Sequence, residues 1–209
     1  MYAFDVARLP HWQQRVWNGH NITPEGAVSS ELLDAQQRTK PAGTIAPEFE
    51  FERLLQEVNA AFLEHYGGLL FRSHGSTPVI IKRVHRFRAL DTAGLLALAK
   101  DIARLTADSI DVSVLRTIVA PANGETWRSL RYLENALATR VDAAIARAAL
   151  TPLAGIYELR LADAHLPRSD IDNAYMLAGV SPQDASIDQA VALIGSAGIS
   201  LKKILSILG

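Results

Sequence analysis

The chain has 209 residues, of which 49% are hydrophobic and 21% are charged, and its formal net charge is −1. This composition is typical of a soluble globular protein with one sizeable core, and the near-neutral charge excludes a global attraction to nucleic acid or anionic lipid, so such binding would need a local patch. The sequence contains no cysteine, which excludes disulfides, thiolate nucleophiles and cysteine-ligated zinc and is consistent with a reducing compartment.

Residues 1–47 differ in composition from the rest of the chain. They contain Trp12, Trp17 and several prolines, and only residues 28–37 have a helical composition. The first residues show no basic start followed by an apolar run, so we predict no secretory signal, and we expect no apolar window long enough to span a bilayer. The sequence therefore predicts an N-terminal arm or linker that packs through its tryptophans, in a cytoplasmic protein without membrane association. Such an opening also suits the C-terminal part of a longer protein.

From residue 48 onward the pattern is helical almost throughout, which predicts one helical domain over residues 48–209. Apolar residues from Phe51 to Phe62 recur at helical spacing, and Gly67-Gly68 ends that helix. The helices expected next cover Thr77 to about Arg88, Asp91 to Leu105, 112–119, about 125–138, 140–150, a segment opening at Thr151-Pro152, a short helix capped by Asp170, and roughly 184–208. Short strand candidates at 69–71 and 79–81 are flanked by helix signals. The expected fold is therefore all-α.

The motifs of most familiar enzyme classes are missing from this sequence. It has no Gly-x-x-x-x-Gly-Lys-Ser/Thr phosphate loop, no Gly-x-Gly-x-x-Gly after a strand, and no Gly-x-Ser-x-Gly elbow. Its six histidines never pair at i, i+4 spacing with a carboxylate between them. We therefore expect neither a dedicated metal site nor a cofactor.

A basic segment, "IIKRVHRFR" at residues 80–88, is the first candidate binding feature. On the predicted helix one face is apolar, and the basic side chains lie largely elsewhere. Cations at such spacing can follow the phosphate backbone of RNA, and the candidate residues are Lys82, Arg83 and Arg86. The alternative is a solvated amphipathic face whose basic side chains lie over the protein surface.

The loop "RSHGSTP" at residues 72–78 is the second candidate, because it leads directly into a predicted helix. Backbone N–H groups and the helix dipole could hold an anion there, with help from Arg72 and His74. The alternative is that Ser76 or Thr77 simply caps the helix.

The segment "YELRLADAH" at residues 157–165 places an arginine, an aspartate and a histidine in an apolar helix. On one helix with Leu153 and Ile156, Arg160 falls in the middle of the apolar stripe. A buried unpaired charge is very costly, so this arginine needs a partner. Asp163, at i+3, is the nearest candidate in sequence.

His165 lies five residues from Arg160 and therefore projects about 140° away on a straight helix. The two could share a site if Pro167 frays the helix end, or if a second protomer supplies one of them across a twofold axis. An arginine that steadies a phosphate and a histidine that moves protons suit metal-free cleavage of RNA, where the 2′-hydroxyl attacks. The alternative is a structural Arg160–Asp163 pair and a histidine that caps its own helix.

An arginine, four intervening residues and a histidine late in an all-α domain resemble the motif of the HEPN superfamily. The resemblance implies a helical bundle, commonly dimeric, of a kind that includes metal-independent ribonucleases of toxin–antitoxin, phage-defence and CRISPR systems. It implies that Arg160 and His165 form a catalytic pair in a cleft at a homodimer interface, with RNA as substrate and an antitoxin or another protein as partner. Leu161 departs from the polar residue usual after the arginine in active members, and inactive members serve as dimerisation or binding modules.

The sequence thus predicts an all-α, HEPN-like helical bundle with an irregular N-terminal arm, and it leaves three functions open. In the first, a metal-independent endoribonuclease, Arg160 holds the scissile phosphate, His165 acts as general acid or base, and Asp163 orients one of them. The basic segment would guide the RNA. The second is a non-catalytic dimerisation or interaction module within a larger protein. The third is a regulatory domain that binds a nucleotide or other anion at the 72–78 loop.

Overall fold

The computed structural model describes residues 6–19, 46–162 and 168–209, and the chain divides into two compact units, Met1–Thr44 and Ile45–Gly209. In the first unit α2 (His11–Gly19) buries none of its residues. Trp12 and Trp17 are exposed within this unit, and the packing of the arm through its tryptophans stays a prediction. The helix expected at 28–37 lies outside the described residues.

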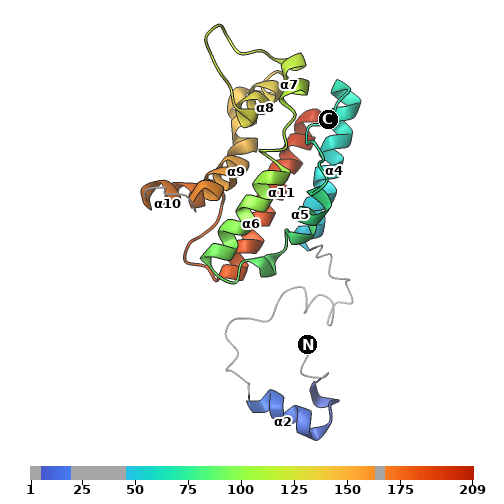
Figure 1. Cartoon of the computed structure of the whole chain (residues 1–209), viewed down its shortest axis with the longest axis vertical. Helices are drawn as coiled ribbons and strands as arrows, with labels where there is room; N and C mark the ends of the chain where they lie inside the picture. The colour runs from blue at the N-terminus through green and yellow to red at the C-terminus, as the bar shows by residue number, and fades with distance from the viewer. Residues whose placement is uncertain (1–5, 20–45, 163–167) are drawn as a thin grey trace. The chain divides into compact units, whose positions relative to one another are not determined.

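The second unit is a helical bundle (Figure 1). Its elements are α4 (Pro47–Tyr66), α5 (Thr77–Arg83), the 3-10 helix η1 (Arg86–Arg88), α6 (Thr92–Leu105), α7 (Val112–Ile118), α8 (Ser129–Leu137), α9 (Ala143–Ala162), α10 (Arg168–Leu177) and α11 (Ser186–Leu208). In the part of the chain that the structure describes, the only β-type pairing is an isolated bridge between Phe71 and Ile110. The predicted all-α class is confirmed.

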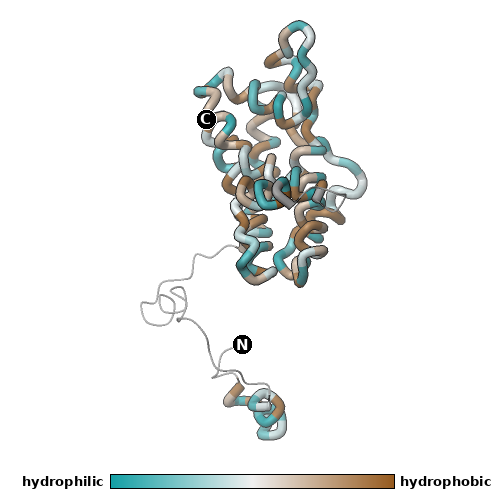
Figure 2. The backbone as a smooth tube through the Cα atoms, turned by 90° about the vertical axis from the view of Figure 1, so that its left-hand side faces the viewer, coloured by the Kyte–Doolittle hydropathy of each residue, from teal (hydrophilic) through white to brown (hydrophobic). Residues whose placement is uncertain are grey.

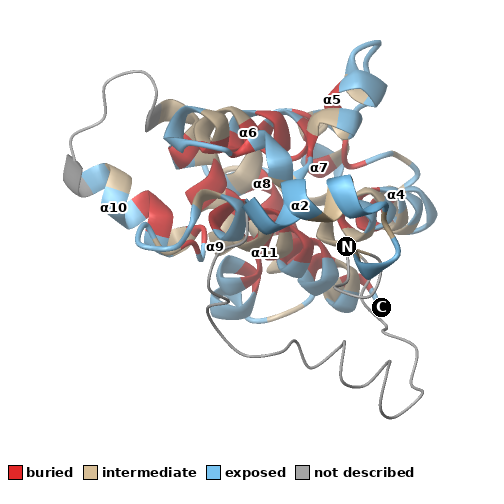
Figure 3. Cartoon of the chain, turned by 90° about the horizontal axis from the view of Figure 1, so that it is seen from below, coloured by how far each residue is buried: buried red, intermediate tan, exposed pale blue. Residues whose placement is uncertain are grey.

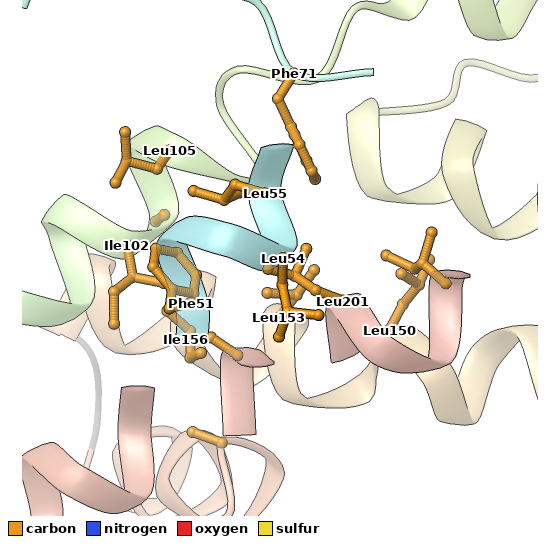
Figure 4. Close-up of a cluster of buried hydrophobic side chains, with 14 of the residues drawn as sticks. Phe51, Leu54, Leu55, Phe71, Ile102, Leu105, Leu150, Leu153, Ile156 and Leu201 are labelled. Carbon is orange, nitrogen blue, oxygen red and sulfur yellow. The ribbon is translucent and has the colours of Figure 1, made fainter. Parts of the chain in front are cut away.

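The core forms where α4, α6, α9 and α11 meet. α11 packs most extensively against α4 and also contacts α6 and α9. Hydrophobic and hydrophilic residues alternate along the helices of the unit (Figure 2), and buried residues concentrate where these four helices face one another (Figure 3). Figure 4 shows buried side chains of the core, which include Phe51, Leu54, Leu55, Ile102, Leu105, Leu150, Leu153, Ile156 and Leu201.

α11 corrects one expectation from the sequence. By length and composition it is apolar enough to cross a membrane, although no such window was expected. Half of this apolar window is buried, on a broad face that packs against α4, α6 and α9, and the opposite face is exposed. A core helix passes the same test of length and composition as a membrane span. The packing of α11 in the core of the unit therefore accounts for its apolar composition.

α9 continues through Pro152, where the sequence predicts the start of a new helix. Proline has no N–H group, so the carbonyl of Ala148 loses its usual helical donor. The Nζ of Lys203, on α11, donates to that carbonyl at 3.4 Å. The Thr151 hydroxyl also donates to the carbonyl of Arg147 at 2.9 Å. These contacts support an unbroken helix, and the predicted boundary at Thr151-Pro152 is wrong.

The helix predicted over 77–88 ends earlier, at the close of α5. The chain turns extended at His85, with φ −148° and ψ 141°, and the imidazole of His85 accepts a hydrogen bond from the N–H of Phe87. The N–H of Arg86 donates to the carboxylate of Glu48 at 3.0 Å. Phe87 is exposed rather than part of an apolar helix face. A partner 38 residues away therefore sets the end of this helix.

Candidate functional site

Arg160 lies in the last turn of α9, whose buried face includes Leu153, Ile156 and Leu159. At 100° per residue Arg160 falls between Leu153 and Ile156, as the helical wheel predicts, and 26% of its side-chain surface stays exposed at this end of the helix. Its guanidinium carbon lies 5.0 Å from the centre of the Tyr157 ring. A half-buried guanidinium stacked on an aromatic ring is held in a defined direction.

Arg160 has its acidic partner on a different part of the chain. Its Nη1 forms an ion pair with Oδ2 of Asp108, in the turn that follows α6. The predicted need for a partner is confirmed, and among the described residues Asp108, 52 residues away in sequence, is such a partner. Asp163 and His165 lie outside the described residues, so their predicted roles remain predictions.

The three basic residues predicted to guide RNA have different surroundings. Arg86 binds Glu48 at two points, with Nε–Oε1 at 2.7 Å and Nη2–Oε2 at 2.9 Å. Arg83 donates from Nε to Oδ2 of Asp101 at 3.1 Å and also pairs through Nη2. Lys82 is exposed. Arg83 and Arg86 therefore help to hold the fold, whereas Lys82 presents its charge to solvent.

Glu48 is a buried carboxylate in the first turn of α4. Its hydrogen bonds to Arg86 lower the pKa of this carboxyl from 4.5 to about 2, and they outweigh burial, which raises it. The same contact raises the pKa of Arg86. Removing one partner of a buried pair leaves an uncompensated charge, which is strongly destabilising. This pair is therefore structural.

Asp101, on α6, is a second buried carboxylate, and it forms ion pairs with three arginines. Its side chain is only 2% exposed. Arg83 and Arg88 approach it at 3.1 Å and 3.2 Å, and Arg104 lies farther away at 3.9 Å. All three arginines keep a third or more of their side-chain surface exposed. One negative charge among three positive ones leaves a local positive excess, which attracts anions.

A groove of about 590 Å³ opens beside Arg104, and we call it the Arg104 groove. It is lined by Arg72, Ser73, His74, Ser76, Ile80, Arg104, Asp108 and Ser109. The N–H of Arg72 donates to the carbonyl of Ser109 at 2.8 Å, which fixes the 72–78 loop against the turn after α6. The predicted anion-binding residues Arg72 and His74 therefore line one groove.

The serine and threonine of this loop have contacts other than the predicted capping. Ser76 is the N-cap residue of α5, but its side chain makes no capping hydrogen bond. Its hydroxyl lies 2.7 Å from Nδ1 of His74. The hydroxyl of Thr77 accepts from the N–H of His74 at 3.0 Å. Both side chains thus hold the loop that carries His74.

The separately predicted sites meet along one side of α6 and the turn after it. Asp101 and Arg104, at i and i+3, lie on one side of α6, and Asp108 lies in the turn that follows the helix. Asp101 contacts the basic segment, Arg104 lines the groove, and Asp108 lines the groove and pairs with Arg160. The three sites therefore form one continuous region.

Sequence reasoning missed Asp101, Arg104 and Asp108. The spacing of Asp101 and Arg104 in a largely apolar helix is a signal that could have found these two, because charges along one side of a core helix require partners, whereas Asp108 lies in the turn after the helix and gave no periodic signal. Glu48 offered no such signal, since an acidic residue in a first helical turn is ordinary.

A second cavity, of about 350 Å³, lies between α8, α9 and α10 and also contacts Tyr157. Arg131 and Arg147 at its edge pair with the same carboxylate, Glu134, at 2.7 Å and 3.1 Å. Neither arginine lines the Arg104 groove. They are therefore matched control positions for its arginines.

Within residues 6–19, 46–162 and 168–209, no group of three or more histidine, aspartate or glutamate side chains is placed to hold a metal ion. No family model matches the chain, and comparisons with curated proteins and with solved structures find no significant match. The candidate site is therefore interpreted from its own geometry.

Proposed function

We propose that the helical unit binds RNA and cleaves it without a metal ion, in a toxin or phage-defence setting, as the resemblance to HEPN ribonucleases implies. The observation that carries the proposal is the meeting of three predicted sites along α6. An RNA strand along this side would meet the arginines around Asp101, then Arg104, then Arg160. Phosphate contacts of this kind position a nucleic acid without reading its sequence.

In the proposed reaction Arg160 holds the scissile phosphate in place of its contact with Asp108. The guanidinium fork matches two phosphate oxygens. The 2′-oxygen of the RNA attacks phosphorus and the bond to the 5′-oxygen breaks, which yields a 2′,3′-cyclic phosphate and a 5′-hydroxyl. His165 removes or returns the proton, and Asp163 orients one of the pair. A cytoplasmic location and an antitoxin or other protein partner belong to the same proposal.

The proposal includes a homodimer. Arg160 and His165 point apart on a straight helix, and a twofold axis can place one protomer's arginine beside the other's histidine. Size-exclusion chromatography with light scattering should show a dimer at micromolar concentration. A strict monomer would contradict the shared cleft.

The test is RNA cleavage in the presence of a chelator. We expect the parent to cleave, and Arg160→Ala and His165→Ala to lose about 100-fold or more in rate, as expected for a phosphate-binding group and a proton-transfer group. Arg147→Ala, on the same helix but paired with Glu134, is the matched control and should cleave like the parent. Circular dichroism verifies that each variant folds. Equal rates for the parent and the Arg160→Ala/His165→Ala double variant would refute the proposal.

A non-catalytic dimerisation or interaction module is the second candidate. It is favoured by Leu161, and by the pairing of Arg160 with Asp108 and its stacking on Tyr157. In that case the parent cleaves no RNA in chelator, and Arg160→Ala weakens the dimer. The same set of variants therefore separates the two candidates.

A further inference from the structure

The Arg104 groove carries a binding function of its own, apart from the reacting bond. We propose that it is a phosphate-binding site, in which Arg72, His74 and Arg104 hold a phosphate group next to the one at Arg160. Its volume of about 590 Å³ falls in the range of small-molecule sites, so it has room for a nucleotide unit. The inference rests on the proposed function in one respect, namely that the phosphate belongs to an RNA strand.

Arg104 lines the groove with a guanidinium that the fold uses little. Its side chain is 45% exposed, and its contact with Asp101 is long, at 3.9 Å. A guanidinium has five N–H donors, so this single distant pair leaves most of them for a ligand. Arg104 comes from α6 and Arg72 from the loop before α5, so two rigidly connected elements supply cations to one groove.

The one carboxylate that lines the groove, Asp108, is paired with Arg160 in the unliganded protein, so a phosphate can enter the groove before Arg160 exchanges this carboxylate for the scissile phosphate. Asp111 has its pKa lowered chiefly by the hydroxyl of Ser113, with a smaller contribution from Arg72. Positive charge nevertheless exceeds negative charge in this region, where five arginines face three carboxylates. These are Arg72, Arg83, Arg88, Arg104 and Arg160 against Asp101, Asp108 and Asp111. The groove itself is lined by Arg72 and Arg104 and by the single carboxylate of Asp108, and this excess of positive charge concentrates anions.

His74 is oriented for a ligand by its neighbours. Its Nδ1 contacts the hydroxyl of Ser76, and its backbone N–H is used by Thr77. The ring nitrogen left for a phosphate oxygen is therefore Nε2, and the site depends on side chains rather than on backbone amides. A phosphate bound there would be recognised by charge and by hydrogen bonds to its oxygens.

The experiment measures binding to the full chain by isothermal titration calorimetry with two probes. One is a 2′-O-methyl hexaribonucleotide without terminal phosphates, which the proposed reaction cannot cleave, and the other is ATP. We expect Arg104→Gln and Arg72→Gln each to weaken the binding of the accepted probe about tenfold. Arg131→Gln, an exposed arginine outside the groove, is the control and should bind like the parent.

The outcomes separate this inference from the proposed function. Groove-dependent binding of the hexanucleotide supports a site for RNA phosphodiesters, whether or not the chain cleaves RNA. If ATP binds in a groove-dependent manner and the hexanucleotide does not, the phosphate site is supported but RNA is not its ligand. If the parent binds neither probe, or if both groove variants bind as the parent does, the inference is overturned, even if cleavage through Arg160 and His165 is found.

Discussion

Two arginine–carboxylate pairs, Arg86–Glu48 and Arg160–Asp108, have the same chemistry but different surroundings. Glu48 is 7% exposed and Arg86 29%, and three hydrogen bonds join them. Asp108 and Arg160 are 32% and 26% exposed, and they meet through one ion pair beside a groove. A buried carboxylate cannot lose its partner without a large penalty, whereas a half-exposed one can be solvated. The first arginine therefore holds the fold, and the second can exchange its carboxylate for a phosphate.

The largest expected effect is on stability. Glu48→Gln should lower the free energy of unfolding by about 3 kcal/mol, because it leaves Arg86 without its charged partner. Asp108→Asn should cost less than about 1 kcal/mol, as is usual for a partly exposed pair. Urea denaturation of both variants checks the difference. Equal losses would show that burial does not distinguish the two pairs.

The pH dependence of stability should show the same difference. The pKa of Glu48 is about 2 in the folded chain, against an ordinary 4.5. The pair therefore stabilises the fold fully above about pH 4.5, and the stabilisation falls as the pH drops toward 2. Between pH 4.5 and pH 3 the parent should lose about 1.5 kcal/mol that Glu48→Gln does not lose. Parallel pH profiles for the two proteins would contradict this assignment.

Asp108→Asn tests whether Arg160 can exchange its carboxylate partner for a phosphate. Removing this carboxylate leaves Arg160 more available to bind phosphate, so we expect the KM for RNA to fall roughly threefold. It also leaves Arg160 less well oriented, so we expect kcat to fall roughly tenfold. Steady-state cleavage in chelator measures the two constants separately. A variant with unchanged KM and kcat would show that Asp108 does not position Arg160.

The smallest expected effect is at Lys82, an exposed cation of the basic segment. Lys82→Gln should change stability by less than about 0.5 kcal/mol. It should also lower the slope of log affinity against log salt by about 1, if this lysine contacts an RNA phosphate. Lys202→Gln, at an exposed lysine paired with Glu50, is the control. An unchanged slope would show that Lys82 does not contact an RNA phosphate.

Local sequence signals predicted most helices correctly. Gly67 ends α4 in a left-handed conformation with φ 70°, and the Asp91 carboxylate caps α6 by accepting from Gly94 at 2.7 Å. The two wrong boundaries have distant causes. Lys203 supports α9 across Pro152, and Glu48 takes the N–H of Arg86. No local pattern contains such partners.

Some residues of the candidate site were predicted from the sequence, but Asp101, Arg104, Asp108 and the arrangement of the site were not. Arg160, Arg72 and His74 could be named from their types and spacing. Their common location depends on the packing of α6 against α5 and α9, which brings Arg104 and Asp108 between them. Because these contacts join segments far apart in sequence, periodicity could not reveal them.

The central position of α11 has a consequence for the order of folding. Its main partner, α4, begins the helical unit, and residues 67–185 lie between the two helices. Contacts across so long a segment form slowly, because the loop must close before they contribute. Until α11 docks, α4 lacks its main packing partner, and α6 and α9, which pack against each other, lack the helix that joins them to α4. We therefore expect the core of this unit to form only after its last helix has been synthesised, and a chain shortened within α11 to aggregate rather than to fold.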